Sequence, residues 1–154
     1  MSGKAIRETL AALGVIASMI FVGMEIRQNT TAIQTNTSQG VFTQYMDGAR
    51  PVMENPELAE LIVRADTAPG SLSLADSLRY NLYLGFEINI YESVYINVAQ
   101  GTMESGVASG WLRGMSRWVC RPGGEGFWRV YAEEYAPIFQ TAMDSVIANT
   151  DCPS

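Results

Sequence analysis

The sequence TLAALGVIASMIFVGMEI, residues 9–26, decides the fold of this chain. It is apolar apart from Thr9, Ser18 and Glu25, and at about 1.5 Å per residue it forms a helix of roughly 27 Å. The hydrocarbon core of a bilayer is about 30 Å thick, so this length fits a short membrane span. We therefore predict a membrane-spanning helix from Thr9 to Ile26.

Two other interpretations of this stretch stay open. A buried helix of a soluble protein is apolar over about 10 to 14 residues, and the uninterrupted run from Leu10 to Gly23 lies at that limit. A cleaved signal peptide needs small residues in an A-x-A-like pattern after its apolar core, whereas Met-Glu-Ile-Arg follows here. The span is favoured because residues 10–24 contain no polar stripe that a soluble helix would turn toward water.

Basic residues predict the orientation of the span. Lys4 and Arg7 precede it, and only Arg27 lies close after it. Because cytoplasmic flanks carry the excess of Lys and Arg, we expect a single-pass membrane protein. Its N-terminus is then cytoplasmic and its C-terminal domain exported.

Length and composition limit the rest. We expect a cytoplasmic tip and membrane anchor at 1–28, one helical domain at 29–150 and a tail at 151–154. Histidine is absent, which removes the commonest general base near neutral pH and the commonest ligand of zinc, copper and iron. The net charge of −6 argues against nucleic acid as a partner.

Cys120 and Cys152 are the two cysteines of the chain. In an oxidising compartment two cysteines are interpreted first as one disulfide, which here ties the C-terminal tail to the loop after Trp118. Two unpaired thiols in a cytosolic domain are the alternative. The two are too few and too far apart in sequence for a metal site.

Helical signals continue after the span. We predict that the first helix runs on through residues 27–46 and ends at Gly48 and the Arg50-Pro51 pair. A second helix begins at Asn55, as N-cap, followed by proline at its first position. Its expected buried face consists of Leu58, Leu61, Ile62 and Ala65.

The longest internal helix is expected from Leu74 to about Gln100, capped by Ser73. This length makes it the natural central partner of the other helices. Its apolar residues recur at intervals of three or four positions and are Leu74, Leu78, Leu82, Phe86, Ile90, Tyr91, Val94, Tyr95 and Val98.

Two more helices complete the predicted fold. One covers Met103 to Val119, and after the CRPGGEG turn the last covers Phe127 to about Ala148, where Pro137 should kink it or split it. The expected fold class is all-α: an N-terminal transmembrane helix that continues into a small helical bundle of about four further helices.

Carboxylates are the remaining candidates for chemistry. Glu87 and Tyr91 share a helix face, but the di-iron pattern of helical bundles needs Glu-x-x-His, and the chain has no histidine. The adjacent Glu133 and Glu134 point about 100° apart and cannot flank one bond. We therefore expect no catalytic residue, no metal, no cofactor and no enzyme activity, with carboxylate-only catalysis as a minor alternative.

Three tryptophans and four arginines gather between residues 111 and 129. Arginine stacked on tryptophan in a concave site can bind an anionic ligand or a partner protein. The favoured interpretation is instead that the tryptophans form a core where two helices meet at a glycine turn, while the arginines reach outward. This Trp/Arg set consists of Trp111, Arg113, Arg117, Trp118, Arg121, Trp128 and Arg129.

The junction GVIASMIFVGMEIRQNTTAI, residues 14–33, resembles the N-terminal signature of a widespread group of uncharacterised bacterial membrane-anchored helical proteins. In that group an apolar helix runs directly into an (E/Q)IRQNT-type segment. NPELAELIVRA, FEINIYESVY and PGGEGFW fit the same group, so the resemblance covers most of the chain. It implies a membrane-anchored helical domain, which with the orientation above gives a protein of the bacterial inner membrane with a periplasmic C-terminal domain, and it transfers no catalytic residue.

These features predict a single-pass protein that acts by protein-protein interaction, as an accessory subunit of a membrane assembly or as a self-associating scaffold. It would contact membrane lipid through its anchor. The alternative is a periplasmic small-ligand binding or sensing module that uses the Trp/Arg set.

Overall fold

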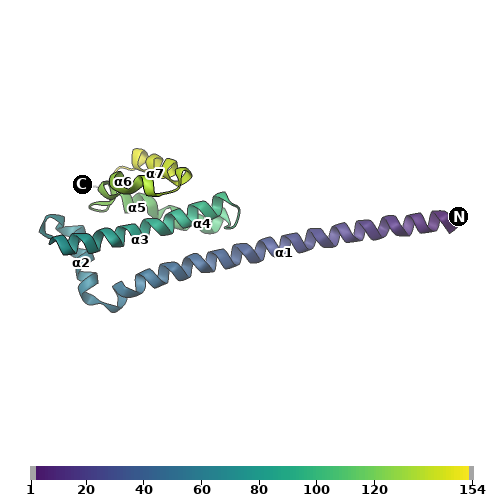
Figure 1. Cartoon of the computed structure of the whole chain (residues 1–154), viewed down its shortest axis with the longest axis horizontal. Coiled ribbons are helices and arrows are strands. Elements are labelled where there is room, and N and C mark those ends of the chain that lie inside the picture. The colour runs from purple at the N-terminus through teal and green to yellow at the C-terminus, as the bar shows by residue number, and fades with distance from the viewer. Residues whose placement is uncertain (1–2, 153–154) are drawn as a thin grey trace.

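A computed structural model describes residues 3–152, and the regular structure in this range is helical throughout, without a strand. The first helix, α1 (Gly3–Glu54), is roughly 78 Å long at 1.5 Å per residue. The other helices gather beside its C-terminal half, so its N-terminal half projects alone (Figure 1). They are α2 (Pro56–Thr67), η1 (Pro69–Ser71), α3 (Leu74–Ala99), α4 (Ser105–Leu112), α5 (Gly114–Val119), α6 (Gly124–Tyr131), η2 (Ala132–Glu134) and α7 (Pro137–Asn149).

The apolar part of α1 is not covered by the rest of the chain. Its large apolar side chains from Leu10 to Ile26 are exposed, from 50% at Val22 to 70% at Met19. By length and composition α1 is the one helix in residues 3–152 that could cross a membrane. The prediction of one long apolar N-terminal helix in an all-helical protein is confirmed.

The predicted end of the first helix is wrong. α1 continues through Gly48 and Pro51 to Glu54. Gly48 is a packing residue, because a Cβ there would lie 1.8 Å from Cζ of Phe86 on α3. Pro51 lies in the last turn of α1, where the loss of one backbone hydrogen bond does not stop the helix.

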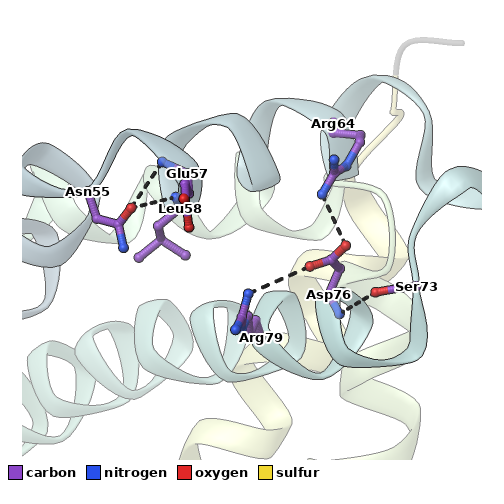
Figure 2. A network of polar contacts seen from close by, with 7 residues as sticks. All are labelled: Asn55, Glu57, Leu58, Arg64, Ser73, Asp76 and Arg79. Carbon is purple, nitrogen blue, oxygen red and sulfur yellow. Dashed lines mark hydrogen bonds and ion pairs between the residues drawn. The ribbon is translucent and has the colours of Figure 1, made fainter.

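The two predicted N-caps are confirmed, and both appear in Figure 2. The Asn55 side chain accepts from the backbone N–H groups of Glu57 at 3.0 Å and Leu58 at 3.3 Å. Ser73 Oγ accepts from the N–H of Asp76 at 3.1 Å. These bonds satisfy amide groups that have no partner inside a first helical turn, so α2 and α3 begin where the sequence places them.

The long helix α3 is central, as predicted, and contacts α1, α2 and α4 through α7. It lies between α1 and the α5–α7 layer (Figure 1). A larger core cluster forms between α2, α3, α5, α6 and α7, and a smaller one joins α1 to α3 and α4. The larger cluster consists of Ala65, Tyr80, Leu84, Ile88, Met115, Trp118, Val119, Trp128, Tyr135, Phe139 and Met143. The smaller consists of Val41, Ile90, Val94, Met103 and Ala108.

The apolar row predicted for this helix is wrong in its first half. Leu74, Leu78 and Leu82 are 93%, 61% and 67% exposed. Tyr80 and Leu84, outside the predicted row, are buried instead. The first half of α3 is apolar on more than one face, and the positions of α2 and α5 to α7 decide which face is covered.

Two predicted helices are divided. The region predicted as one helix over Met103–Val119 begins at Ser105 and breaks at Arg113 into α4 and α5. The last helix is split, as Pro137 indicated: α6 ends at Tyr131, and α7 begins at the proline, which occupies its first turn. Six α-helices therefore follow α1 in the described range instead of four.

The predicted cysteine pairing is confirmed. Cys120 and Cys152 form a bridge with their Cα atoms 5.1 Å apart. Cys120 directly follows α5 and Cys152 follows α7, so the bridge closes a loop with a sequence separation of 32.

Candidate functional site

A hollow of about 660 Å³ opens between the end of α1, α2 and the first half of α3. We call it the first hollow. Its apolar lining comes from all three helices and includes Val52, Leu58, Leu61, Leu82 and Phe86. Its volume lies in the range of about 300 to 1,000 Å³ that is typical of binding pockets.

A bridge of ion pairs crosses the wall of the first hollow. Arg64 Nη2 on α2 lies 3.1 Å from Asp76 Oδ2 on α3, and Arg79 Nη1 lies 3.8 Å from Asp76 Oδ1. Figure 2 shows both arginines turned toward the same carboxylate, which is held at the start of α3 by the Ser73 cap. Such solvent-exposed pairs contribute at most about 1 kcal/mol each. One carboxylate balances one of the two positive charges, so the three side chains together keep a net charge of about +1.

Two further acids line the first hollow without an ion-pair partner in residues 3–152. They are Glu57 and Glu60, one in the first turn of α2 and one a turn later, and both are exposed. Glu57 lies where the positive end of the α2 dipole stabilises a carboxylate. The hollow thus has an apolar interior and an acidic margin.

A second hollow of about 460 Å³ lies against α6 and η2, across the α3 side chains Leu82 and Phe86 from the first hollow. Leu78, Phe127 and Tyr131 supply much of its apolar lining, and Glu134 lies at its edge. Leu82 and Phe86 line both hollows. We define the α3 ridge as Leu74, Leu78, Leu82 and Phe86. Leu82 and Phe86 lie between the two hollows, and Leu78 borders the second. Phe86 is partly buried against Gly48 of α1, whereas the three leucines are exposed.

A half-buried charged network lies behind the first hollow. Arg121 Nη1 donates to Glu87 Oε2 at 2.8 Å, and its Nη2 lies 3.6 Å from Asp66 Oδ2. The Tyr80 hydroxyl donates to Asp66 at 2.6 Å, and the Tyr83 hydroxyl donates to Glu87 at 2.9 Å. The network joins α2, α3 and the segment after α5, next to the disulfide.

The protonation states of Tyr80, Tyr83 and Arg121 favour a structural role for this charged network. Burial, and after it the charge of Glu87, raises the pKa of Tyr83 to about 12, so its hydroxyl stays protonated at neutral pH. Burial raises the pKa of Tyr80, and the hydrogen bond to Asp66 adds to it. Burial lowers the pKa of Arg121, but Glu87 outweighs it and the pKa is raised overall. Neither tyrosine is therefore available as a base near pH 7.

The structure divides the tryptophans of the Trp/Arg set between two places. Trp118 and Trp128 are 2% and 3% exposed in the larger core cluster. Their indole N–H groups donate to the Leu84 carbonyl at 3.2 Å and to Asp144 Oδ1 at 2.8 Å. Trp111 lies apart from them, half-buried against Tyr45 of α1 with ring centroids 5.2 Å apart.

The four arginines of the set do not converge. Arg113 and Arg117 are exposed, on the α4–α5 junction and on α5. Arg129 is exposed and pairs with Glu125 one turn earlier on α6. Arg121 turns inward to Glu87. The set does not form one concave surface in the described range.

The carboxylates Glu92 on α3 and Glu133 and Glu134 in η2 have structural partners or lie apart. Glu92 accepts the backbone N–H of Ala136 at 2.7 Å, which fixes the turn before α7. Glu133 and Glu134 are exposed in η2. In residues 3–152 no group of three or more acidic, cysteine or histidine side chains is placed to hold a metal ion.

The two hollows and the ridge were missed by sequence reasoning. The available signal was the spacing of Leu74, Leu78 and Leu82 at intervals of four, which we assigned to the core. A helix that is apolar on several faces indicates extra buried surface, and in this fold one apolar face has no intramolecular cover. Comparison of the chain with family models, with curated proteins and with solved structures found no match.

Proposed function

We propose that this chain is a single-pass inner-membrane protein whose helical domain, a small bundle, binds another protein in the periplasm. It would act as an accessory subunit or scaffold of a membrane assembly, without catalysis. The observation that carries the proposal is apolar surface left uncovered at two separate places, the projecting part of α1 and the three leucines of the α3 ridge. Exposed apolar surface of this kind is typical of contacts with lipid and with protein partners.

The anchor supports the membrane part of the proposal. Large apolar side chains are exposed all along residues 10–26 of α1, as expected of a helix solvated by lipid. Lys4 and Arg7 before it, against Arg27 alone close after it, support a cytoplasmic N-terminus. The disulfide favours an oxidising compartment for the domain, which agrees with that orientation.

The geometry of α1 supports a position of the α3 ridge away from the bilayer. Gln34 Nε2 donates to the Gly101 carbonyl at 3.2 Å, which joins α1 to the α3–α4 turn. Gln34 is eight residues after Ile26, or about 12 Å along the helix, so this turn faces the membrane. Gly48, which lines the first hollow, is 22 residues after Ile26, or about 33 Å. The ridge is thus presented well away from the bilayer.

The alternative, a small-ligand module that uses the Trp/Arg set, has less support. Trp118 and Trp128 are sealed in the core, and the arginines diverge. A small ligand would find an apolar space of about 660 Å³ in the first hollow instead. The uncovered ridge beside that hollow favours a protein partner.

Thiol labelling in intact cells tests the topology. We expect Cys120 and Cys152 to react with a membrane-impermeant maleimide only after reduction. Labelling without reductant and only by a permeant reagent would contradict both the orientation and the bridge.

Chemical cross-linking in native membranes, followed by sizing in mild detergent, tests the assembly. We expect species larger than the 16.8 kDa chain. A monomer without cross-links under both conditions would contradict the proposed function.

A further inference from the structure

We propose that the α3 ridge and its two flanking hollows bind a basic amphipathic helix of a partner protein. The helix would carry one apolar stripe with Lys or Arg on both flanks. This inference rests on the proposed function and specifies the partner of the same surface.

The apolar geometry fits a helix. The four ridge residues from Leu74 to Phe86 recur at intervals of four, so they lie along roughly 18 Å, or a little over three turns, of α3. Helices that dock in grooves present anchors at i, i+3, i+4 and i+7, over a similar length. A ridge between two grooves is the complement of that pattern, because side chains of the partner enter the hollows on either side.

The charge around the ridge selects a basic partner. The two hollows are lined by five carboxylates and two arginines, and both arginines pair with Asp76. Glu57, Glu60 and Glu134 have no ion-pair partner among residues 3–152. Lys or Arg on the flanks of a docked helix would meet these acids, and opposite charges at the rim of an interface increase the association rate and select the partner.

The same charges disfavour two other occupants. A second copy of the chain docked ridge to ridge would bring the two sets of acids together, and like charges repel. An anionic lipid surface would be repelled in the same way, and the first hollow lies about 33 Å along α1 from the end of the apolar stretch. A basic helix of a different protein satisfies both the apolar and the charged part of the surface.

The test uses the full chain in nanodiscs of neutral phosphatidylcholine and a fluorescein-labelled peptide of about 18 residues, five helical turns. The peptide carries Leu at i, i+3, i+4 and i+7 and Lys on the flanks, and a second peptide replaces every Lys with Glu. Fluorescence anisotropy measures binding. We expect the Lys peptide to bind with an affinity that falls as salt rises, and the Glu peptide to bind at least about tenfold more weakly.

Variants locate the binding to the ridge. The double variant Leu78→Ser with Leu82→Ser should lower the affinity for the Lys peptide by at least about tenfold, because it removes apolar contacts of the ridge. Both side chains are exposed, so the fold does not depend on them. Glu57→Gln with Glu60→Gln should weaken it by about threefold and reduce the salt dependence. Val107→Ser, on α4 outside both hollows, is the matched control and should leave binding unchanged.

Equal binding of the Lys and Glu peptides, or no effect of the leucine variants, overturns the inference. A photoreactive side chain at position 82 or 107 in living cells separates this result from the proposed function. Cross-links to another protein from position 107 but not 82 would overturn the inference and leave the function standing. Cross-links from 82 to a second copy would overturn it in favour of self-association, and none from either position would count against both.

Discussion

Replacing Gly124 with alanine should destabilise the domain, whereas the same change at Gly126, two residues later in α6, should not. A Cβ on Gly124 would lie 2.4 Å from the carbonyl oxygen of Trp118 and 3.2 Å from that of Val119. These are backbone atoms at the end of α5, next to the disulfide at Cys120, and they cannot rotate away as a side chain can. A Cβ on Gly126 would have nothing within 4 Å.

The magnitude follows from the distance. A carbon and a carbonyl oxygen come no closer than about 3.3 Å even in favourable contacts, so α6 must move by about 0.9 Å away from α5 at Gly124. Overpacking of this kind costs about 1 to 3 kcal/mol. At Gly126 the alanine raises the helix propensity and contributes up to about 1 kcal/mol. We therefore expect the free energies of unfolding of the two variants to differ by about 1 to 4 kcal/mol.

Urea unfolding in mild detergent, followed by tryptophan emission, measures this difference. Trp118 and Trp128 are buried in the larger core cluster, so their emission reports on unfolding of the domain and not of the exposed part of α1. Both variants should unfold with the slope of the parent chain, the Gly124 variant at lower urea. Coincident midpoints for the two variants would refute the close approach of α6 to the end of α5.

Three further predictions concern the bridge, the docking of α1 and the charged network. Replacing Cys120 and Cys152 with serine should lower the free energy of unfolding by about 3 to 4 kcal/mol, because the unfolded chain regains the entropy that closing a loop with a separation of 32 had removed. A loss of less than about 1 kcal/mol in urea unfolding would contradict this. Gly48→Ala should lower the free energy of unfolding by about 1 to 3 kcal/mol through overpacking against Phe86. Gly40→Ala, on the open side of α1, should not lower it. Equal thermal midpoints of the two variants would disprove the docking of α1 on α3. Burial raises the pKa of Glu87 above its ordinary 4.5, so the folded state binds this proton more tightly than the unfolded state, and the free energy of unfolding falls as the pH rises from 4.5 through the raised pKa. Glu87→Gln should flatten that part of the curve of stability against pH. An unchanged slope in the variant would show that other groups cause the dependence.

The features that the sequence predicted correctly depend on neighbours within a few residues. Asn55 and Ser73 cap their helices through backbone N–H groups two or three positions later, and Pro137 starts α7 because of its own ring. The apolar stretch from Leu10 to Ile26 is likewise recognisable from its own composition. Such local rules apply without knowledge of the rest of the fold.

The features that the sequence did not predict depend on distant residues. Gly48 is compatible with a helix end, and only the Phe86 ring, 38 positions later, makes it a packing residue inside α1. Trp111 and Trp118 both fit the helical spacing of a buried face. Trp118 is buried in the larger core cluster, whereas Trp111 packs beside Tyr45 of α1. No periodicity in one helix reveals which of its faces a neighbour will cover.

The exposed leucines of α3 show how this limit bears on function. A row at intervals of four has the same sequence pattern whether it is covered by the chain itself or by another protein. Here the chain uses Tyr80, Leu84 and Ile88 for its own core and leaves the leucines between two hollows with acidic margins. About 33 Å of α1 separates Gly48, at the first hollow, from the end of the apolar stretch at Ile26. Under the proposed membrane topology, a partner that reaches the ridge must extend about equally far from the bilayer, or be soluble in the compartment that holds the domain.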